Sequence, residues 1–487
     1  MRRGRIVVAL FALLVAGCVV GPDYRRPAID VPAAFPHAAG LDATGTGDAQ
    51  WWKEVGDPVL DALIVEALAR NRSVAIAAAN VEQAAALLTQ TRSALFPQVG
   101  YGGSGERSRA SESGASPALA SLLPNPQTAY QAVLSASWEL DLWGRIRRLS
   151  EAARANLLAT DEARRGVVLS LVAAVATDYV QLRGLDEQLA IARSTRANYA
   201  ESLRLFELQF KYGQVSQMNV AQARSQYETA TAQIPQIEAQ IAQTENALSV
   251  LLGRNPGPIE RGRTIYEFAL PDVPAGVPSS LLERRPDLMQ SEQNLIAANA
   301  QIGAARALYF PTISLTGAFG SASAELSNLF KGPARVWSYA GQFAGPIFTF
   351  GAISGQVRQA EAAQRAALAG YELAIQNAFA DVDNALVARQ KLAEQLAAQE
   401  RLVSSLRDYA RLARLQYDGG YAPYSTVLQA EQTLFPAEIN LAAIRSSLYV
   451  AGIGIYKALG GGWVTQAENL TPTAVRAPDG DRRPPLL

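Results

Sequence analysis

The chain has 487 residues, and its 44 Lys and Arg balance its 44 Asp and Glu. Without a net charge it has no overall field that would attract nucleic acid, so we expect no nucleic-acid partner. One histidine, His37, and one cysteine, Cys18, leave no material for a His/Cys metal cluster or a Ser-His catalytic pair. Carboxylate pairs remain possible, but the interior acids lie on helical patterns typical of solvated faces. We therefore expect no enzyme activity, no metal and no cofactor.

The N-terminus has the pattern of a secretory signal. Three arginines precede an apolar segment over residues 6–15, which is too short to span a bilayer but suits a signal peptide. Val15-Ala16-Gly17-Cys18 resembles the lipobox of bacterial lipoproteins. This resemblance implies cleavage before Cys18 and its lipidation, as an N-palmitoyl and S-diacylglycerol cysteine that anchors the chain. Val19 is not the aspartate that retains lipoproteins at the inner membrane, which implies sorting to the outer membrane. The alternative is a chance cysteine at the end of an ordinary signal peptide.

After the signal, the chain consists of two similar halves. Three short segments, here called marks, recur in the same order in both halves. The recurrence is offset by about 214 residues for the first mark and by about 207 residues for the other two. They are Arg92–Val99 and Arg306–Ile313 (RSALFPQV, RALYFPTI), Leu140–Gly144 and Ile347–Gly351 (LDLWG, IFTFG), and Leu208–Gly213 and Leu415–Gly420 (LQFKYG, LQYDGG). Chance similarity between Ala-rich helices could imitate one match, but three in order predict a structural duplication.

Each half begins with a predicted helix, over residues 74–95 and 288–308, where Ala, Gln, Glu and Leu occur without proline. Each helix stops before the proline of the first mark, and the pattern then alternates with the period of a strand. We predict four strands of about ten residues: two follow these prolines, and two precede the glycines of the second mark. Segments rich in Ser, Ala, Gly and Pro at 108–127 and 321–335 predict exposed loops between paired strands.

The predicted strands are apolar on one face. The apolar positions are Tyr130, Ala132, Leu134, Ala136, Trp138 and Leu140, then Trp337, Tyr339 and Phe343, and more weakly Val99, Tyr101, Ile313, Leu315 and Phe319. Ten residues is the length that a tilted membrane-spanning strand needs. Four strands cannot close a membrane barrel, and each unpaired backbone group in hydrocarbon costs several kcal/mol, so such a chain must oligomerise. The alternative is a soluble sheet, half-buried against a core.

Two unusually long helices are predicted after Gly144 and Gly351, because no proline interrupts residues 128–234 or 347–422. About 65 helical residues would span roughly 100 Å. Apolar residues at three-four spacing predict coiled-coil packing; they are Val168, Leu171, Val175, Tyr179 and Leu182, and Leu392, Leu396, Val403, Leu406, Ala410 and Ala413, with Gln399 as an exception. Glycines at 211–216 and 418–425 predict that each long helix ends there and that the chain reverses its direction. Pro235 and Pro436 are candidate kinks in the returning helices.

Together these features resemble the outer-membrane factors of tripartite efflux and secretion systems, and more narrowly the TolC-like lipoproteins typified by OprM and NodT. The resemblance covers the chain to about residue 470. It rests on the lipobox, Gly21-Pro22-Asp23-Tyr24, Trp51-Trp52, Asp57-Pro58-Val59-Leu60, the duplicated helix-Phe-Pro-strand unit and the Gly-containing helix tips.

The resemblance implies an α+β membrane protein with the TolC-like trimeric fold. Four strands from each chain of a homotrimer would close a 12-stranded barrel in the outer membrane of a Gram-negative bacterium. The long helices would continue it as a periplasmic α-helical barrel with a mixed equatorial domain. The implied function is a passive exit duct for small molecules, delivered by an inner-membrane transporter through a periplasmic adaptor protein. No phosphate-binding loop of the GxxxxGK[ST] kind indicates an energy source of its own. The covalent lipid on Cys18 would be the only attached group.

The implied domain boundaries follow the repeat. They are a signal peptide at 1–17, an N-terminal anchor and equatorial segment at 18–71, a first repeat at 72–252, an equatorial linker at 253–286, a second repeat at 287–459, and an equatorial segment with a disordered tail at 460–487.

The resemblance also places function at the periplasmic tips. Residues Tyr212, Gly213, Gln214, Val215 and Ser216, with Gly419, Gly420, Tyr421 and Ala422, would contact the adaptor. The glycines also have a simpler interpretation as helix terminators, and both can hold together. Tyr417, Asp418, Asn219 and Gln429 would hold a gate closed through polar contacts. Gln429 stands where many relatives carry an aspartate, so a strong acidic ring is not expected here.

Two other functions fit part of the pattern. A lipid-anchored periplasmic coiled-coil scaffold without a pore explains the long helices, but not the alternating Trp/Tyr strands. An outer-membrane enzyme, such as a barrel lipase, needs a base, and His37 lies outside every predicted element.

Overall fold

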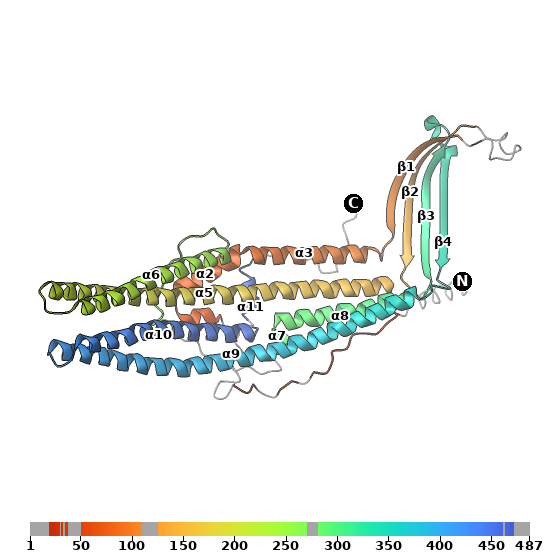
Figure 1. Ribbon diagram of the computed structural model, residues 1–487. Helices are drawn as coiled ribbons and strands as arrows, with labels where there is room; N and C mark the ends of the chain where they lie inside the picture. Colours follow the sequence, from red (N-terminus) through yellow and green to blue (C-terminus); the bar gives the residue numbers. More distant parts are fainter. Residues whose placement is uncertain are drawn as a thin grey trace.

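The computed structural model describes residues 19–29, 31–32, 35–37, 50–109, 111, 125–269, 281–460 and 463–471. The predicted signal peptide, Cys18 and the predicted tail lie outside these residues. Figure 1 shows an elongated bundle of helices, with a sheet that rises from one end and leans away from the bundle axis.

The two halves share a unit of one helix, two strands and two further helices in the same order. The first has η1 (Trp51–Val55), α2 (Pro58–Arg70), α3 (Arg72–Ser93), β1 (Gln98–Ser108), β2 (Gln127–Leu140), α5 (Arg145–Lys211) and α6 (Gln217–Leu251). The second has α7 (Leu281–Arg284), α8 (Pro286–Ala307), β3 (Thr312–Ser323), η3 (Leu326–Asn328), η4 (Gly332–Ala334), β4 (Arg335–Ala344), α9 (Ala352–Asp418), α10 (Tyr424–Ala458) and α11 (Val464–Glu468). The helix–strand–strand–helix–helix unit is therefore duplicated, as predicted.

The register of the sheet confirms the duplication at the level of single residues. The strands are antiparallel in the order β1-β2-β3-β4. Gly100 of β1 lies opposite Ser135 of β2. Their equivalents at offsets of 214 and 207 residues are Ser314 and Gln342, and these two also lie opposite each other. The central pair β2–β3 joins the two halves.

The predicted loop at 321–335 is shorter than its composition indicated, because Ser321 to Ser323 stay paired with β2 and extend β3 to Ser323. Most of the predicted loop at 108–127 lies outside the described residues. The β3–β4 connection contains the short turns η3 and η4. Serine and alanine are weak strand formers, but a neighbouring strand that satisfies their backbone groups overrides that preference.

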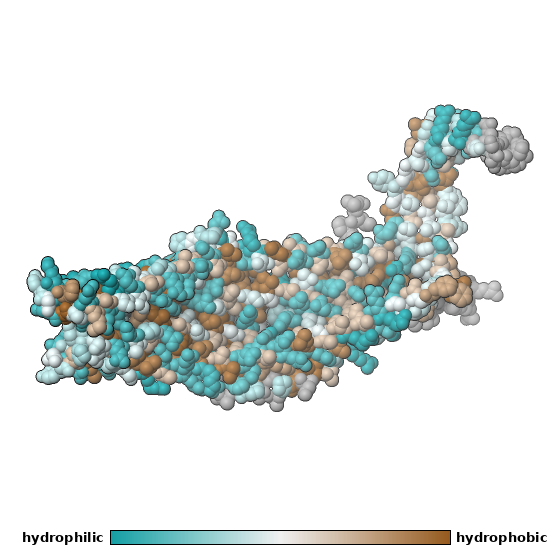
Figure 2. All heavy atoms as spheres, viewed as in Figure 1, coloured by the Kyte–Doolittle hydropathy of each residue, from teal (hydrophilic) through white to brown (hydrophobic). Residues whose placement is uncertain are grey.

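One face of the sheet is apolar and the other is small and polar. Across the four strands one row is Tyr101, Leu134, Phe319 and Trp337, and the next row is Gly100, Ser135, Ala318 and Ser338. Tyr101 is 91% exposed and Trp337 68% exposed, so the apolar face has no cover from the chain itself. In Figure 2 the middle of the sheet is pale to brown, whereas its far end is hydrophilic. Such a face suits contact with lipid, and the opposite face suits water.

The helices confirm the predicted lengths and the predicted stripe of α5, whereas in the predicted stripe of α9 Val403 and Ala413 are buried and the other members are partly buried. Helices α5 and α9 have 67 residues each, and the predicted stripe from Val168 to Leu182 is buried in the main hydrophobic core. Helix α5 packs on α3, α6, α8 and α10, while α9 packs on α8 and α10. Helices α5 and α10 are also apolar enough to cross a membrane by length and composition, but half or more of each apolar stretch is buried inside the chain, as in a core helix.

Polar and proline exceptions in these helices are accommodated locally. Gln399, the exception in the α9 stripe, donates from its side-chain amide to the Ala437 carbonyl at 2.9 Å. Pro235 and Pro436 lie inside α6 and α10, as predicted, and both helices continue through them. Each proline removes one backbone donor from its helix.

Candidate functional site

The two helix reversals at the free end of the bundle have the same hydrogen bonds. The amide of Gly213 donates to the Phe210 carbonyl, and the amide of Gln214 donates to Gln209. At the other tip Gly420 donates to Tyr417, and Tyr421 to Gln416, each 207 positions further on. Both glycines have positive φ, 72° and 76°, as the Schellman ending of a helix requires. The equivalence shows that the duplication extends to the tips.

The predicted adaptor-contacting residues lie on the surface of these tips. Residues 212–214, 216 and 419–421 are exposed, whereas Val215 and Ala422 are partly buried. Tyr421 is 89% exposed. Exposed apolar side chains on a turn are available to a partner, which suits the predicted role without testing it.

Behind the tips, three aromatic rings hold the two hairpins together. Phe206 of α5 lies 4.0 Å from Tyr424 of α10 between ring centroids, and Tyr417 of α9 lies 5.3 Å from Tyr424. Phe206 and Tyr424 are buried, and burial raises the pKa of Tyr424 to about 12. Phe206 and Tyr424 were not among the sequence-predicted site residues. In the sequence, each of them is an aromatic residue within a turn or two of a helix end, and this position could have indicated them.

The predicted gate residues make local contacts rather than one shared cluster. Tyr417 belongs to the aromatic cluster above. Asp418 lies 3.5 Å from Arg414 on its own helix, and Asn219 accepts from the Ser216 hydroxyl at 2.6 Å. Gln429 is exposed on α10. Tyr417 therefore reaches the other hairpin, with its ring centroid 6.4 Å from that of Phe206, whereas the contacts of Asp418 and Asn219 stay within their own hairpins. The predicted gate role of these residues concerns contacts between copies.

Glu431 is the titratable group that the sequence analysis missed at this end. Its Oε2 atom is buried and accepts no hydrogen bond within the described structure, and its backbone carbonyl accepts from the Tyr199 hydroxyl at 3.2 Å. Burial raises the pKa of Glu431, and the charge of Arg414 opposes that shift only in part. The carboxyl lines a cavity of about 490 Å³ between α5, α9 and α10. Its position in an alanine-rich helix gave no signal of burial.

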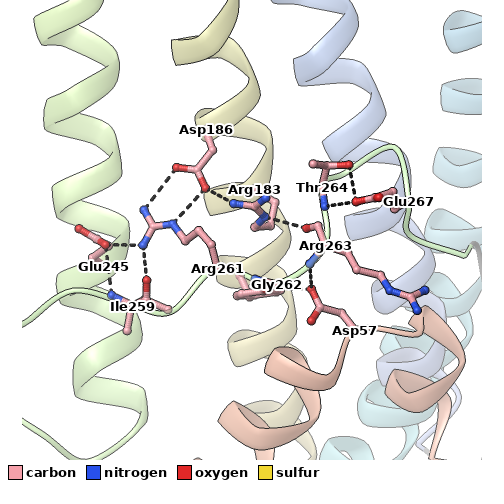
Figure 3. Close-up of polar contacts among 11 residues, drawn as sticks. Asp57, Arg183, Asp186, Glu245, Ile259, Arg261, Gly262, Arg263, Thr264 and Glu267 are labelled. Carbon is pink, nitrogen blue, oxygen red and sulfur yellow. Dashed lines mark hydrogen bonds and ion pairs between the residues drawn. The ribbon is translucent and has the colours of Figure 1, made fainter.

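Halfway along the bundle, the segment after α6 is fixed by charged groups (Figure 3). Arg261 donates to Asp186 of α5 at 3.0 Å and to Glu245 of α6 at 2.5 Å. Arg183, also on α5, donates to the Arg263 carbonyl at 2.9 Å. These contacts tie residues 259–263 to both long helices of the first half. This part of the predicted linker is thereby held against the long helices.

Asp57 adds a buried anchor to the same linker. Its carboxylate accepts from the Tyr179 hydroxyl at 2.8 Å, from the Arg263 amide at 3.0 Å and from the Val59 amide at 2.9 Å. The last of these caps α2, so the Asp57-Pro58 motif starts that helix and holds the linker at once. Nearby, Trp51 stacks on Tyr456 and Trp52 meets Trp463 edge-on, which brings the segments predicted for the equatorial domain together.

At the sheet end, residues 19–26 form an extended segment, here called the N-terminal strap. Arg148, which is 4% exposed, donates to the carbonyls of Val20 and Gly21 and to the Asp23 carboxylate, the last at 2.7 Å. Asn299 of α8 donates to the Pro22 carbonyl at 2.9 Å. The strap therefore lies between α5 of the first half and α8 of the second, directly after the predicted lipidation site.

A sheet with one uncovered apolar face, two open edges and a bundle of helices about 100 Å long is the architecture of an outer-membrane channel subunit. Comparison with known proteins agrees. The model of the outer membrane efflux protein family matches residues 63–254 and 277–461.

Relatives and solved structures agree with the family match. The chain is 38% identical over 459 residues to the cation efflux system protein CusC of Escherichia coli, covering 93% of this chain and 97% of the relative. It is 39% identical to the solvent efflux pump outer membrane protein SrpC of Pseudomonas putida, with the same coverage.

Among solved structures, it resembles the Neisseria gonorrhoeae MtrE outer membrane channel in its open state, with TM-score 0.82, 32% identity, and 92% and 99% of the two chains covered. It also resembles the Campylobacter jejuni CmeC channel, with TM-score 0.88, 25% identity, and 94% and 100% covered.

The chain belongs to the outer membrane efflux protein family. It is an outer-membrane channel component of a tripartite efflux system, with its strands in the outer membrane and its helices in the periplasm. The predicted family, fold and function are confirmed, and nothing supports the scaffold without a pore.

Proposed function

We propose that three copies of this chain form a passive duct, without catalytic activity, whose cargo is set by the inner-membrane transporter that loads it. The proposal of a trimer rests on one observation: the four-stranded sheet has two unpaired edges and an uncovered apolar face. In hydrocarbon each unpaired edge group costs several kcal/mol, so closure with further copies is strongly favoured. Three copies would contribute twelve strands.

A periplasmic adaptor would bind the helix tips around Gly213 and Gly420. These turns are exposed, they carry apolar side chains such as Tyr212 and Tyr421, and their backbone is fixed by paired hydrogen bonds. A rigid, exposed turn loses little conformational entropy when a partner binds.

The gate would use Tyr417, Asp418, Asn219 and Gln429 between neighbouring hairpins. Adaptor binding would then favour an arrangement in which the hairpins separate, as in other two-state transitions of packed helices. The relatives' names describe export of cations and of solvents, so the duct chemistry in this family accommodates unlike cargo.

Cys18 would carry the lipid. The strap that follows it is fixed beside the base of the sheet, so acyl chains at residue 18 would lie near the membrane surface. Several acyl chains give a stable anchor.

The experiment is single-channel recording of the purified protein in planar bilayers, together with its mobility on an unheated gel. We expect a trimer with a low conductance in the closed state, and a higher conductance after Tyr417→Ala and Gln429→Ala. Arg204→Ala is the control, because Arg204 is exposed and pairs with Glu201 of its own helix turn. A non-conducting species would contradict the duct, and unchanged conductance in both variants would remove these residues from the gate.

A further inference from the structure

The apolar face of the sheet, here called the lipid-facing side, carries two charged side chains, Arg107 and Arg335. Side chains alternate between the faces of a strand, so Arg107, six residues after Tyr101, and Arg335, two residues before Trp337, lie on the same face as these rings. All other side chains on this face of the four described strands are uncharged. Charge on the lipid-facing side is thus confined to these two positions.

Both arginines lie at the end of the sheet that is farthest from the helices. Arg107 is the last residue but one of β1, and Arg335 is the first residue of β4. The opposite ends of these strands lead to α3 and α9, which lie in the periplasm. Figure 2 shows the far end as hydrophilic, beyond the pale and brown middle of the sheet. The two guanidinium groups therefore lie on the outer side of the membrane, at the level of the lipid headgroups.

On β4, Arg335 lies just beyond a pair of aromatic rings. Trp337 and Tyr339 occupy the next two lipid-facing positions and stack, with ring centroids 5.7 Å apart. Tyr339 is 81% exposed, so the chain itself does not cover this pair. Trp and Tyr rings concentrate where hydrocarbon meets the headgroups. Two residues of strand, about 7 Å, carry Arg335 from that level into the headgroup layer.

Strand β1 repeats this arrangement at the other edge of the sheet. Arg107 lies opposite Thr128, and the next lipid-facing pair toward the helices is Gly105 with Tyr130. A Cβ at Gly105 would come within 3.1 Å of the Tyr130 ring, so this ring lies against β1 just below Arg107. An arginine therefore follows an aromatic ring at both edges.

Neither guanidinium has an acceptor within the described part of the chain. Arg107 and Arg335 are exposed, and neither takes part in a hydrogen bond or ion pair there. Glu106 lies on the opposite face of β1 because it precedes Arg107 by one residue. The Glu325 carboxylate accepts from the Asn328 amide at 2.7 Å. An arginine on the lipid-facing side is costly at the middle of a bilayer and costs little at its interface, where headgroups can pair with it.

We propose that Arg107 and Arg335 bind phosphate groups of lipids in the outer leaflet. A guanidinium can donate two parallel N–H bonds to one phosphate, and the rings below it would pack on the acyl chains of the same lipid. The occupant is a lipid rather than a free anion, because each cation is continuous with an uncovered apolar surface. Lipid A, a glycolipid with two phosphates and several acyl chains, has this chemistry. Each arginine has its own aromatic ring within one chain, so the proposal does not depend on the trimer.

The test measures the binding of fluorescently labelled, bisphosphorylated lipid A to the full chain in a non-ionic detergent. The unaltered chain should bind it more tightly than the same lipid without its phosphates. The variant Arg107→Gln with Arg335→Gln should bind the phosphorylated lipid about ten-fold more weakly. The matched control is Arg193→Gln with Arg204→Gln, which removes the same charge from exposed positions on α5 and should bind like the unaltered chain.

Each outcome decides for or against the lipid site. Equal binding of the two lipids by the unaltered chain overturns the proposal without any variant, so the result does not depend on how a variant folds. Equal losses in the two double variants would show a general effect of charge. Displacement of the lipid by excess inorganic phosphate at constant ionic strength would show a site for a free anion. Both results overturn the proposal. A loss confined to Arg107→Gln with Arg335→Gln, with unchanged mobility on an unheated gel, supports it.

Discussion

Single buried polar residues decide how tightly each end of this molecule is held. At the sheet end Arg148 is almost fully buried, yet its guanidinium has four acceptors, so its charge is compensated. At the tip end Glu431 is also largely shielded, but its Oε2 atom has no hydrogen-bond partner within the described structure. A buried carboxylate oxygen without a hydrogen-bond partner destabilises the fold that buries it. Glu431 therefore opposes the packing of the tip hairpins, whereas the contacts of Arg148 support that of the strap.

Replacing Glu431 by glutamine should stabilise the protein at neutral pH. A folded-state pKa above the unfolded value means that this group favours folding most when protonated, and that this contribution is lost as pH rises through the folded pKa. The neutral amide of the variant would resemble the protonated carboxyl at every pH. We expect Glu431→Gln to raise the melting temperature at pH 8 by a few degrees, about 1 kcal/mol, and to change it little at pH 4.

Glu438→Gln is the matched control, since Glu438 lies two turns further along α10 and pairs with Arg407 at 2.7 Å. It should not be stabilising. Equal melting temperatures for the unaltered chain and Glu431→Gln at pH 8 would contradict the argument.

Among the elements, the long helices and strands were predictable and the linker geometry was not. Periodicity at 168–182 and alternation at 130–140 are local signals, so helix and strand could be assigned from sequence. The position of residues 259–263 depends on Asp57, Arg183 and Asp186, which all lie far from the linker in the chain. No short window contains that information. The same reason hid Phe206, Tyr424 and Glu431, which come together only when the hairpins pack.

A substitution at Gly262 tests whether the contacts of the linker with Asp57 stabilise the protein. A Cβ at this position would overlap the Asp57 carboxylate, so Gly262→Ala must displace either the linker or the cap of α2. We expect a loss of about 2–3 kcal/mol in unfolding free energy, measured by urea denaturation with tryptophan fluorescence. Gly257→Ala is the control, because a Cβ there meets nothing closer than 4.0 Å. Similar stabilities of the two variants would show that the Asp57 contacts are not required.

At the scale of the whole molecule, the sheet lies in the outer membrane, and the lipid predicted at Cys18 would add a second attachment. The sheet has its own apolar face, so the lipid would assist sorting and assembly rather than provide the sole anchor. The sequence predicts a lipobox, but it did not predict the strap that follows. Its contacts with Arg148 and Asn299 join residues more than a hundred positions apart.

Cys18→Ser, expressed behind a cleavable signal peptide, tests that division of roles. We expect less trimer in the outer membrane, by a few-fold, with the conductance of each remaining pore unchanged. Fractionation and unheated gel mobility measure the first quantity, and planar bilayers the second. Complete absence of trimer from the outer membrane would show that the lipid is essential.

The strap also limits the symmetry that a duplicated chain can reach. It lies between the two halves, against Arg148 of α5 and against Asn299 and Gly303 of α8. The counterparts of these residues in the duplicated unit are Gly355, Ala85 and Thr89, none of which could repeat the Arg148 and Asn299 contacts. In the proposed trimer, six nearly equal units would thus be separated by two alternating kinds of groove near the membrane. A protein that encircles the duct there must either recognise one kind of groove three times or accommodate both.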